Sequence, residues 1–267
     1  MMEDNKLQAV SDWWQTDIID MEPGKIHFHG QPIENLIGQL SFSQMIWFML
    51  KSEKPTQTQT LLLDAVLMSA VDHGPQAPSI AIARMAASCG VGINNAMASA
   101  INSLGDVHGG AGEQALELYL NVKLLIEQGM NLESAVTQVL DIFRRDYGKY
   151  IPGFGHRFHP VDPRSVKLKQ LVQMQIDAGS ITGQFLTISE EMEDQIQIGK
   201  SKPVPLNIDG ATAIIYGELG FEPELARGLF CLSRSVGILA HAWEEMNSGK
   251  RNKGPMPKGM LWSYTGK

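Results

Sequence analysis

A short glycine-rich loop followed by a histidine is the stretch of this sequence whose residue types are best suited to chemistry. It runs from Lys149 to Arg164 and reads KYIPGFGHRFHPVDPR. Pro152 and the two glycines after it exclude regular helix or sheet and leave backbone N–H groups open to a ligand. His156 follows the second glycine directly. An imidazole can transfer a proton near neutral pH, so this loop could combine ligand binding with acid–base chemistry.

The charge around this loop indicates the kind of ligand. Seven basic and two acidic residues lie between Arg144 and Lys169, a local balance of +5 in a chain whose formal net charge is −7. A basic region in an acidic protein favours an anionic ligand. A basic surface loop with one buried histidine would explain the same residues, so the residue types alone leave both interpretations open.

Four more polar residues stand in apolar or glycine-rich surroundings, namely His73, His108, Asp209 and Arg234. A lone carboxylate such as Asp209 is normally unfavourable in a segment like PLNIDGATAII, unless it caps the helix that begins at Gly210. Arg234, within an apolar helix, needs a buried anion or a carboxylate partner. His73 and His108 could equally be satisfied core histidines or caps. Together with His156, these groups could form and stabilise an enol on a polycarboxylate substrate.

Metal binding is not expected. The segment from Lys25 to Ile33 predicts a short hairpin in which His27 and His29 share a strand face, but no third ligand lies close in sequence. His156 and His159 are three residues apart, with Pro160 and no nearby carboxylate to complete a site. The chain also lacks a Walker motif, GxSxG and HExxH, and its glycine loop lacks the third glycine of a dinucleotide fingerprint.

The bulk composition indicates a soluble globular protein. The 267 residues are 43% hydrophobic and 19% charged, and the acidic balance argues against nucleic acid or an anionic membrane as the main partner. The N-terminal residues do not resemble a signal peptide, and no apolar run near them could span a bilayer. Cys89 and Cys231 lack zinc spacing and are predicted to be core thiols in a reducing compartment. We therefore expect a cytoplasmic protein.

The elements that must position these groups are almost all helical, because the apolar residues recur with a period near 3.6. Ser41 and Gln44 form a capping box for the first clear helix. The predicted helices cover residues 42–51, 55–72, 79–89, 95–104, 112–128, 131–147, 162–177, 189–199, 205–219 and 223–246. The fold class predicted from this pattern is all-α.

Two of these helices have an unusual composition. Residues 79–89 and 95–104 are rich in Ala, Ser and Gly. Small side chains let helix axes approach closely, so this composition fits either a central buried pair or a subunit interface. The long helix over 223–246 places five large apolar residues on one face: Leu229, Leu232, Val236, Leu239 and Trp243.

Four segments then resemble, in order, the active-site segments of the citrate synthase superfamily: GDVHGGAGEQA, IPGFGHRFHPVDPRS, LNIDGATA and SRSVGILAHAWEE. The opening IHFHGQPIENL is also similar to that superfamily's N-terminal pattern, so the resemblance covers nearly the whole chain. The short length and the segment Asp72–Pro75 (DHGP) look more like citryl-CoA lyase, either stand-alone or as the C-terminal module of ATP-citrate lyase. The resemblance implies a citrate synthase-like homodimer, with a large domain of residues 1–110 and 221–267 and a small domain of 111–220 closing over the site.

The resemblance also implies roles for individual residues. Asp209 would exchange the methyl proton of acetyl-CoA, His108 would hydrogen-bond the thioester oxygen, and His156 would serve the oxaloacetate carbonyl or the citryl hydroxyl. Substrate carboxylates would be held by His73, Arg164 and Arg234. The adenine end of CoA would be held by the loop residues Ile151, Pro152, Gly153, Phe154, Gly155 and Arg157. No metal and no tightly bound cofactor is implied, because the CoA thioester is a substrate.

The leading functional hypothesis is a citryl-CoA lyase that reversibly cleaves citryl-CoA to acetyl-CoA and oxaloacetate. The alternatives are a compact citrate or 2-methylcitrate synthase, which also hydrolyses the thioester, and a non-catalytic CoA-binding paralogue. Synthases carry an arginine in an RPR segment that crosses the dimer to the substrate. Here the comparable residues are Met256-Pro257-Lys258, so this contact is weakened, replaced by Lys258 or supplied by Arg251. The ATP-citrate lyase module has no histidine at the position of His108, so the direction of the reaction stays open.

Overall fold

The computed structural model describes residues 10–156, 160–254, 257 and 259–266. It divides the chain into two compact units, Met1–Asp64 and Ala65–Lys267. Helices dominate the described residues, and the predicted all-α class is confirmed. No helix in this part of the chain is long and apolar enough to cross a membrane. The domains predicted from the sequence, 1–110 with 221–267 and 111–220, are defined by their movement around a bound substrate. That division stays a prediction.

The first unit contains a small antiparallel meander in the order β1-β2-β3, followed by helices. Its elements are β1 (Ile19–Glu22), β2 (Lys25–Phe28), β3 (Gln31–Pro32), η1 (Ile33–Asn35) and α2 (Phe42–Lys51). The pairing of Phe28 with Gln31 confirms the predicted hairpin, and Ser41 with Gln44 forms the predicted capping box. His29 stands beyond β2 with φ 42°, so the prediction that it shares a strand face with His27 is wrong.

The remaining helices begin with α3, which starts in the first unit and ends in the second. They are α3 (Gln57–Ser69), α4 (Pro78–Ser88), α5 (Ile93–Ile101), α6 (Ala111–Glu127), α7 (Leu132–Tyr147), α8 (Pro163–Asp177), α9 (Gln184–Gln197), α10 (Ile208–Glu218) and α11 (Pro223–Met246). The predicted start of α9 at residue 189 is five residues late. Its first turn is capped by a distant side chain, since the Glu218 carboxylate accepts hydrogen bonds from the N–H groups of Gly183 and Phe185. No local sequence signal reveals such a cap.

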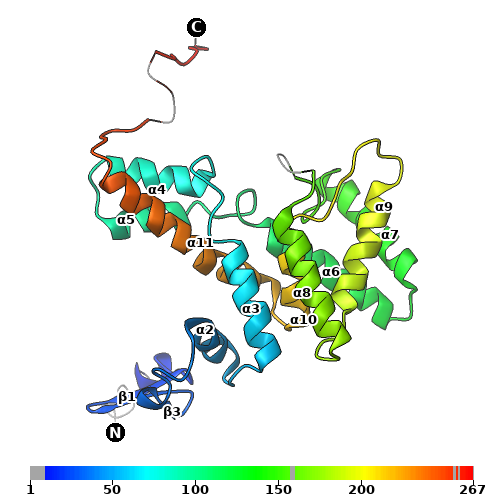
Figure 1. Cartoon of the computed structure of the whole chain (residues 1–267), viewed down its shortest axis with the longest axis horizontal. Coiled ribbons are helices and arrows are strands. Elements are labelled where there is room, and N and C mark those ends of the chain that lie inside the picture. Colours follow the sequence, from blue (N-terminus) through cyan, green and yellow to red (C-terminus); the bar gives the residue numbers. More distant parts are fainter. Residues whose placement is uncertain (1–9, 157–159, 255–256, 258, 267) are drawn as a thin grey trace. The chain divides into compact units, whose positions relative to one another are not determined.

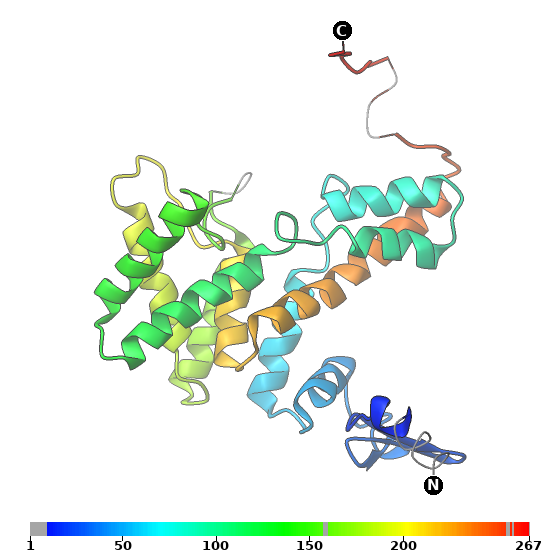
Figure 2. The same ribbon diagram turned by 180° about the vertical axis from the view of Figure 1, so that it is seen from behind.

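In the second unit, α11 runs alongside α4 and α5, as both views show (Figures 1 and 2). The packed core between these helices is built mainly from alanine: Ala77, Ile80, Ala83, Ala87, Ala96, Ala100, Ile238 and Ala242. Ala83, Ala96 and Ala100 are completely buried. The small side chains therefore let these helices approach within the chain, which confirms the buried-pair interpretation of their composition.

The face of α11 that packs is not the one that its largest side chains occupy. Leu229 is buried, but the other four predicted face residues are 43–60% exposed: Leu232, Val236, Leu239 and Trp243. Small and polar residues line the buried face instead, among them Ser233, Arg234 and Gly237. The prediction of core cysteines is likewise wrong for Cys89, which is exposed at the C-cap of α4, whereas Cys231 is half-buried.

The other half of the second unit is organised around α10, which contacts α6, α8 and α9. Every residue of α10 from Gly210 to Tyr216 is buried. A helix that is apolar on all sides is expected at the centre of a helical assembly. The candidate catalytic residue Asp209 lies in the first turn of this central helix.

Candidate active site

The glycine loop packs directly against the start of α10. Asn207 donates from its backbone N–H to the Gly153 carbonyl at 3.0 Å and from Nδ2 to the Gly155 carbonyl at 2.8 Å. A Cβ on Gly210 would lie 2.5 Å from the Gly153 carbonyl oxygen, and one on Gly153 would lie 2.9 Å from Gly210 Cα. Both positions therefore require glycine, and the loop that carries His156 is fixed to the helix that carries Asp209.

Asp209 is not the cap of α10. The side chain of Asn207 caps this helix, accepting hydrogen bonds from the N–H groups of Asp209 and Gly210 at 2.9 and 3.2 Å. The capping interpretation of Asp209 is therefore wrong, and its carboxyl group is left for another role. Burial raises the pKa of Asp209 above its ordinary value, although the positive charges of Arg164 and Arg234 act in the opposite direction. A carboxylate with a raised pKa is a better proton acceptor from a weak carbon acid.

His108 is held as a neutral imidazole by the first turn of α4. The backbone N–H of Ser79 donates to His108 Nε2 at 3.1 Å, and the Ser79 hydroxyl lies 3.0 Å from the same nitrogen. An N–H group can only donate, so Nε2 is unprotonated and Nδ1 carries the proton. Burial, followed by the charge of Arg234, lowers the pKa of His108. The positive end of the α4 dipole opposes protonation in the same way, so His108 presents one N–H donor to a ligand.

His73 lies in the turn between α3 and α4, where its neighbour Asp72 fixes the backbone. The Asp72 carboxylate accepts a hydrogen bond from Gly74 N–H at 3.2 Å and lies 3.3 Å from His241 Nε2. The His73 ring meets the His156 ring edge-on, with centroids 5.9 Å apart. Burial and the charges of Arg164 and Arg234 lower the pKa of His73. The structure therefore places the rings of His73 and His156 in contact.

Arg234 is 5% exposed and packs over the Phe230 ring at 4.8 Å. Its Nε donates to the Ala70 carbonyl at 3.0 Å, just before the turn that carries His73. Within the described part of the chain, no carboxylate forms an ion pair with Arg234. Burial lowers the pKa of Arg234, while the charges of Asp209 and Asp72 raise it. A buried guanidinium without a carboxylate partner is a suitable receptor for an anionic ligand.

One more contact anchors α11 to the same turn. Gly237 donates its N–H to the Val71 carbonyl at 3.1 Å, and a Cβ at this position would lie 2.1 Å from that oxygen. The close approach requires glycine and lets Arg234 reach the end of α3. The small residues on the buried face of α11 therefore have a positional role beside the site.

Arg164 already has a carboxylate partner. Its Nε and Nη2 donate to the two oxygens of Asp162 at 3.0 and 2.9 Å, and the Asp162 side chain is fully buried. Asp162 also caps α8 by accepting from Arg164 N–H at 3.0 Å. Burial would raise the pKa of Asp162, but the hydrogen bonds and charge of Arg164 lower it below the ordinary value. The remaining nitrogen, Nη1, makes only a long hydrogen bond of 3.5 Å to the Ser69 carbonyl. It is therefore the part of Arg164 best placed to bind a ligand.

The predicted site residues therefore interact electrostatically as one group: His73, His108, His156, Arg164, Asp209 and Arg234. Not every residue of the predicted CoA loop can offer its side chain to a ligand. The side chains of Ile151 and Phe154 are buried and support the loop from within. Arg157 lies outside the described residues. The CoA-binding role of Ile151, Pro152, Gly153, Phe154, Gly155 and Arg157 stays a prediction. Where the structure is described, no three His, Cys, Asp or Glu side chains could hold a metal ion.

Comparison with known proteins accounts for this arrangement. The family model for the C-terminal domain of citrate synthase matches residues 38–254. The chain belongs to the citrate synthase family. It is 31% identical over 232 residues to a glyoxysomal citrate synthase of Cucurbita maxima, covering 81% of this chain and 42% of the relative. It is 27% identical over 217 residues to a citrate synthase of Acidithiobacillus ferridurans, covering 79% and 53%. The chain thus spans about half the length of these relatives.

Solved structures of the family share the fold. The structure of a citryl-CoA lyase from Hydrogenobacter thermophilus superposes with a TM-score of 0.82 at 31% identity, and the match covers 95% of each chain. A citrate synthase from Thermoplasma acidophilum, solved with carboxymethyl coenzyme A and oxaloacetate, matches with a TM-score of 0.66 at 22% identity. That match covers 85% of this chain and 58% of the other. The predicted citrate synthase-like fold is confirmed.

Sequence reasoning missed two residues that position the site. Ser79 fixes the tautomer of His108, and Pro78 before it is the available signal, since proline at the first helical position leaves the next N–H without an intrahelical partner. Asn207 caps α10 two residues before Asp209. Both Asn and Asp are good caps, and only the geometry distinguishes which of them has that role.

Proposed function

We propose that this protein is a citryl-CoA lyase, which reversibly cleaves citryl-CoA to acetyl-CoA and oxaloacetate. The observation that carries the proposal is the match to a citryl-CoA lyase at 31% identity and a TM-score of 0.82, whereas three solved citrate synthases match at 18–22% identity with TM-scores of 0.57–0.66. The grouping of a carboxyl with a raised pKa, a neutral imidazole donor and two arginines supports it.

In the cleavage direction, His156 takes the proton of the citryl hydroxyl, and the oxygen electron pair forms the new ketone of oxaloacetate. The bond between this carbon and the methylene group breaks, and its electron pair passes to the thioester oxygen as an enolate. His108 donates the Nδ1–H to that oxygen, a hydrogen bond that strengthens as charge develops. Asp209, protonated at the start of this step, delivers its proton to the methylene carbon and gives acetyl-CoA. Its raised pKa favours the protonated form that this step needs.

Arg164 and Arg234 hold the carboxylates of the oxaloacetate half, together with His73. The planar guanidinium groups suit carboxylates because two N–H groups can bind the two oxygens. Arg234 is the more available of the two, because Arg164 uses Nε and Nη2 for Asp162. The CoA thioester is a substrate in this proposal, no bound cofactor takes part, and the active form is a cytoplasmic homodimer.

A compact citrate synthase is the second candidate, because the protein relatives that the chain matches include citrate synthases. A synthase must admit a water to citryl-CoA and direct it at the thioester, whereas a lyase must exclude that water. Synthases carry an arginine where this sequence has Met256-Pro257-Lys258, which favours the lyase. Met256 and Lys258 lie outside the described residues, so Lys258 and Arg251 both stay candidates for the missing contact.

The deciding experiment supplies citryl-CoA to the purified protein and couples oxaloacetate to malate dehydrogenase. The lyase predicts oxaloacetate formation together with acetyl-CoA. Mixed with acetyl-CoA and oxaloacetate, the protein should release little free CoA thiol. Rapid stoichiometric thiol release with accumulation of citrate would replace the lyase with the synthase. No turnover in either assay would leave the non-catalytic CoA-binding paralogue.

A further inference from the structure

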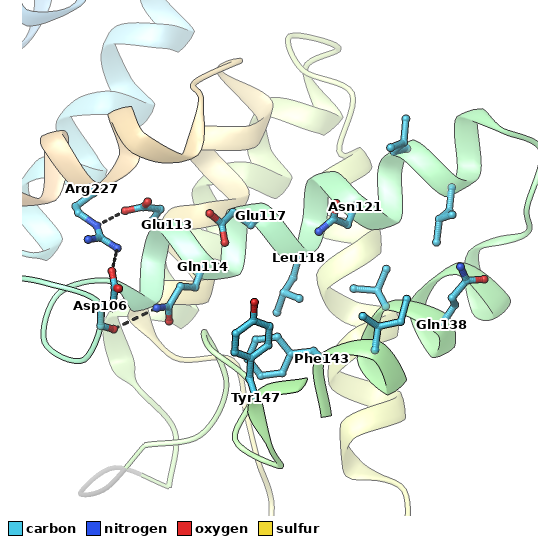
Figure 3. Close-up of a pocket in the computed structure, with 14 residues that line it drawn as sticks. Asp106, Glu113, Gln114, Glu117, Leu118, Asn121, Gln138, Phe143, Tyr147 and Arg227 are labelled. Atoms are coloured by element: carbon cyan, nitrogen blue, oxygen red, sulfur yellow. Dashed lines mark hydrogen bonds and ion pairs between the residues drawn. The ribbon is translucent and has the colours of Figure 1, made fainter. Parts of the chain in front are cut away.

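A cavity lies in a groove between α6 and α7, and the candidate catalytic residues do not line it. Its volume is about 700 Å³, within the range of about 300–1,000 Å³ typical of small-molecule sites. Figure 3 shows Glu117 and Asn121 on α6 facing Phe143 and Tyr147 on α7. The apolar wall consists of Leu118, Leu124, Leu125, Val139, Ile142 and Phe143. Leu124 and Ile142 are about half exposed, so an apolar surface is left open to solvent.

The polar end of the groove is acidic and incompletely neutralised. Asp106, Glu113 and Glu117 line it, and Arg227 is the only basic residue among its described lining. Arg227 is already shared, because it pairs with Asp106 at 2.7 Å and with Glu113 (Figure 3). Glu117 is exposed, but its partial desolvation, followed by the charges of Glu113 and Glu224, raises its pKa, and the charge of Arg227 acts in the opposite direction. Among the described residues, three carboxylates and one basic residue line the groove, so it carries net negative charge beside an apolar wall, which disfavours CoA phosphates and favours a cation.

An aromatic pair lines the same groove as this carboxylate. The rings of Phe143 and Tyr147, one helical turn apart on α7, have centroids 5.1 Å apart and are tilted by 32°. Tyr147 is 79% exposed and lines the groove, so one ring face is accessible to an occupant. Aromatic faces attract organic ammonium ions, and a nearby carboxylate adds to that attraction. The groove thus combines the three features that recognise an alkylammonium group.

We propose that this groove binds a small amphiphilic organic cation, with its ammonium group between Glu117 and the Phe143–Tyr147 pair and its apolar body along α6 and α7. Charge complementarity and cavity volume support an occupant of this kind. The groove also includes part of the loop that carries His108, since Asp106 lines the groove and lies two residues before that histidine. The Asp106 carbonyl accepts a hydrogen bond from Gln114, which also lines the groove. An occupant would therefore contact the segment that positions the enol-stabilising group. This consequence rests on the proposed function, whereas binding itself does not.

The test is isothermal titration calorimetry of the full chain with n-octylammonium chloride at low ionic strength, with n-octyl sulfate as the probe of opposite charge. For a ligand of this size we expect a Kd of about 1 mM or tighter for the ammonium probe and at least about tenfold weaker binding of the sulfate. Absence of measurable heat with the ammonium probe, or equal affinity for both probes, would overturn the proposal. Because calorimetry needs no turnover, its result is independent of whether the lyase assay succeeds.

Two variants, each with a matched control, locate the site. Glu117→Gln should weaken octylammonium binding at least about fivefold, whereas Glu53→Gln, which removes the same charge from an exposed turn, should not. Tyr147→Leu should weaken binding about two- to fivefold and Tyr147→Phe should not, since only the aromatic face is required. Glu117 and Tyr147 are exposed, so these variants should fold, as circular dichroism can verify. Unchanged affinity in Glu117→Gln would place the cation elsewhere and reject the groove.

Discussion

The backbone N–H of Ser79 donates a hydrogen bond to Nε2 of His108 at 3.1 Å. A backbone donor cannot reverse its role, so this contact sets which nitrogen of His108 can donate to a substrate. We expect Ser79→Ala, which keeps the N–H and removes only the hydroxyl, to retain turnover within about threefold. His108→Ala should lower kcat about 10²–10³-fold, the usual effect of losing an oxyanion donor. Steady-state assays of both variants test this, and equal losses would assign the control of the tautomer to the hydroxyl.

The lowered pKa values of His73 and His108 predict how stability depends on pH. A histidine with a depressed pKa in the folded state binds fewer protons there than in the unfolded state. Stability is therefore fully present above the ordinary histidine pKa of about 6.5 and is lost as the pH falls toward the folded-state pKa. The melting temperature should therefore decrease as the pH is lowered from about 6.5. The double variant His73→Gln/His108→Gln should melt with a shallower dependence on pH, and an unchanged slope would contradict the two shifts.

Asp209→Asn should separate activity from stability. We expect turnover to fall about 10²–10⁴-fold, as for a general acid or base, with oxaloacetate affinity nearly unchanged. Because burial raises the pKa of Asp209, its ionised form costs stability at neutral pH, and the cost disappears below its ordinary pKa of about 4. The variant should therefore melt higher than wild type at pH 7 and equally at pH 3.5, by calorimetry. Wild-type turnover in Asp209→Asn would remove this residue from the mechanism.

The two arginines should differ in what else they support. Arg164→Ala and Arg234→Met should each weaken oxaloacetate binding by more than about 1.5 kcal/mol, because a bound carboxylate loses its partner. Arg164→Ala should also lower the melting temperature, since it strands the buried Asp162 carboxylate. Arg234→Met keeps the apolar packing on Phe230 and breaks no ion pair with a described carboxylate, but it removes the hydrogen bond to the Ala70 carbonyl, so its melting temperature should fall less than that of Arg164→Ala. Calorimetry with oxaloacetate measures the affinities, and wild-type affinity in both variants would exclude the arginines from the site.

Gly210→Ala should damage the site without touching a catalytic group. The new Cβ would meet the Gly153 carbonyl oxygen at 2.5 Å and must displace the loop that carries His156. We expect at least about a tenfold loss of kcat and a lower melting temperature. Gly228→Ala is the matched control, because no described neighbour lies within 4 Å of the Cβ that it would add on α11. This exposed helical position should gain about 0.5–1 kcal/mol in stability. A Gly210→Ala variant as active as the control would show that the loop tolerates displacement.

The sequence predicts elements better than it predicts their faces. Local signals place Asp162 at the start of α8 and Ser41 at the start of α2, because capping is written within three or four residues. The exposed Leu232 and Trp243 of α11 could not be foreseen, since periodicity identifies a face but not the partner that covers it. The start of α9 was missed because its cap, Glu218, lies on another helix.

The candidate site follows a similar division. Two of the residues that it groups could be singled out from residue types, because an apolar segment seldom contains Asp209 or Arg234 without a reason. Its couplings could not be predicted, since the partnership of Arg164 with Asp162 and that of His108 with Ser79 depend on geometry. Asn207 and Asp209 could exchange roles on sequence alone, and only the observed hydrogen bonds distinguish them.

The contact between Gly153 and Gly210 has a consequence for engineering this protein. Backbone packed on backbone has no rotamers with which to adjust, so these two segments, more than fifty residues apart in the chain, are complementary only to each other. A library that varies the His156 loop alone would mostly sample chains that cannot close this contact. A chimera between relatives would need to exchange the loop and the first turn of α10 together. The two segments are separate in sequence but form one packed unit in space.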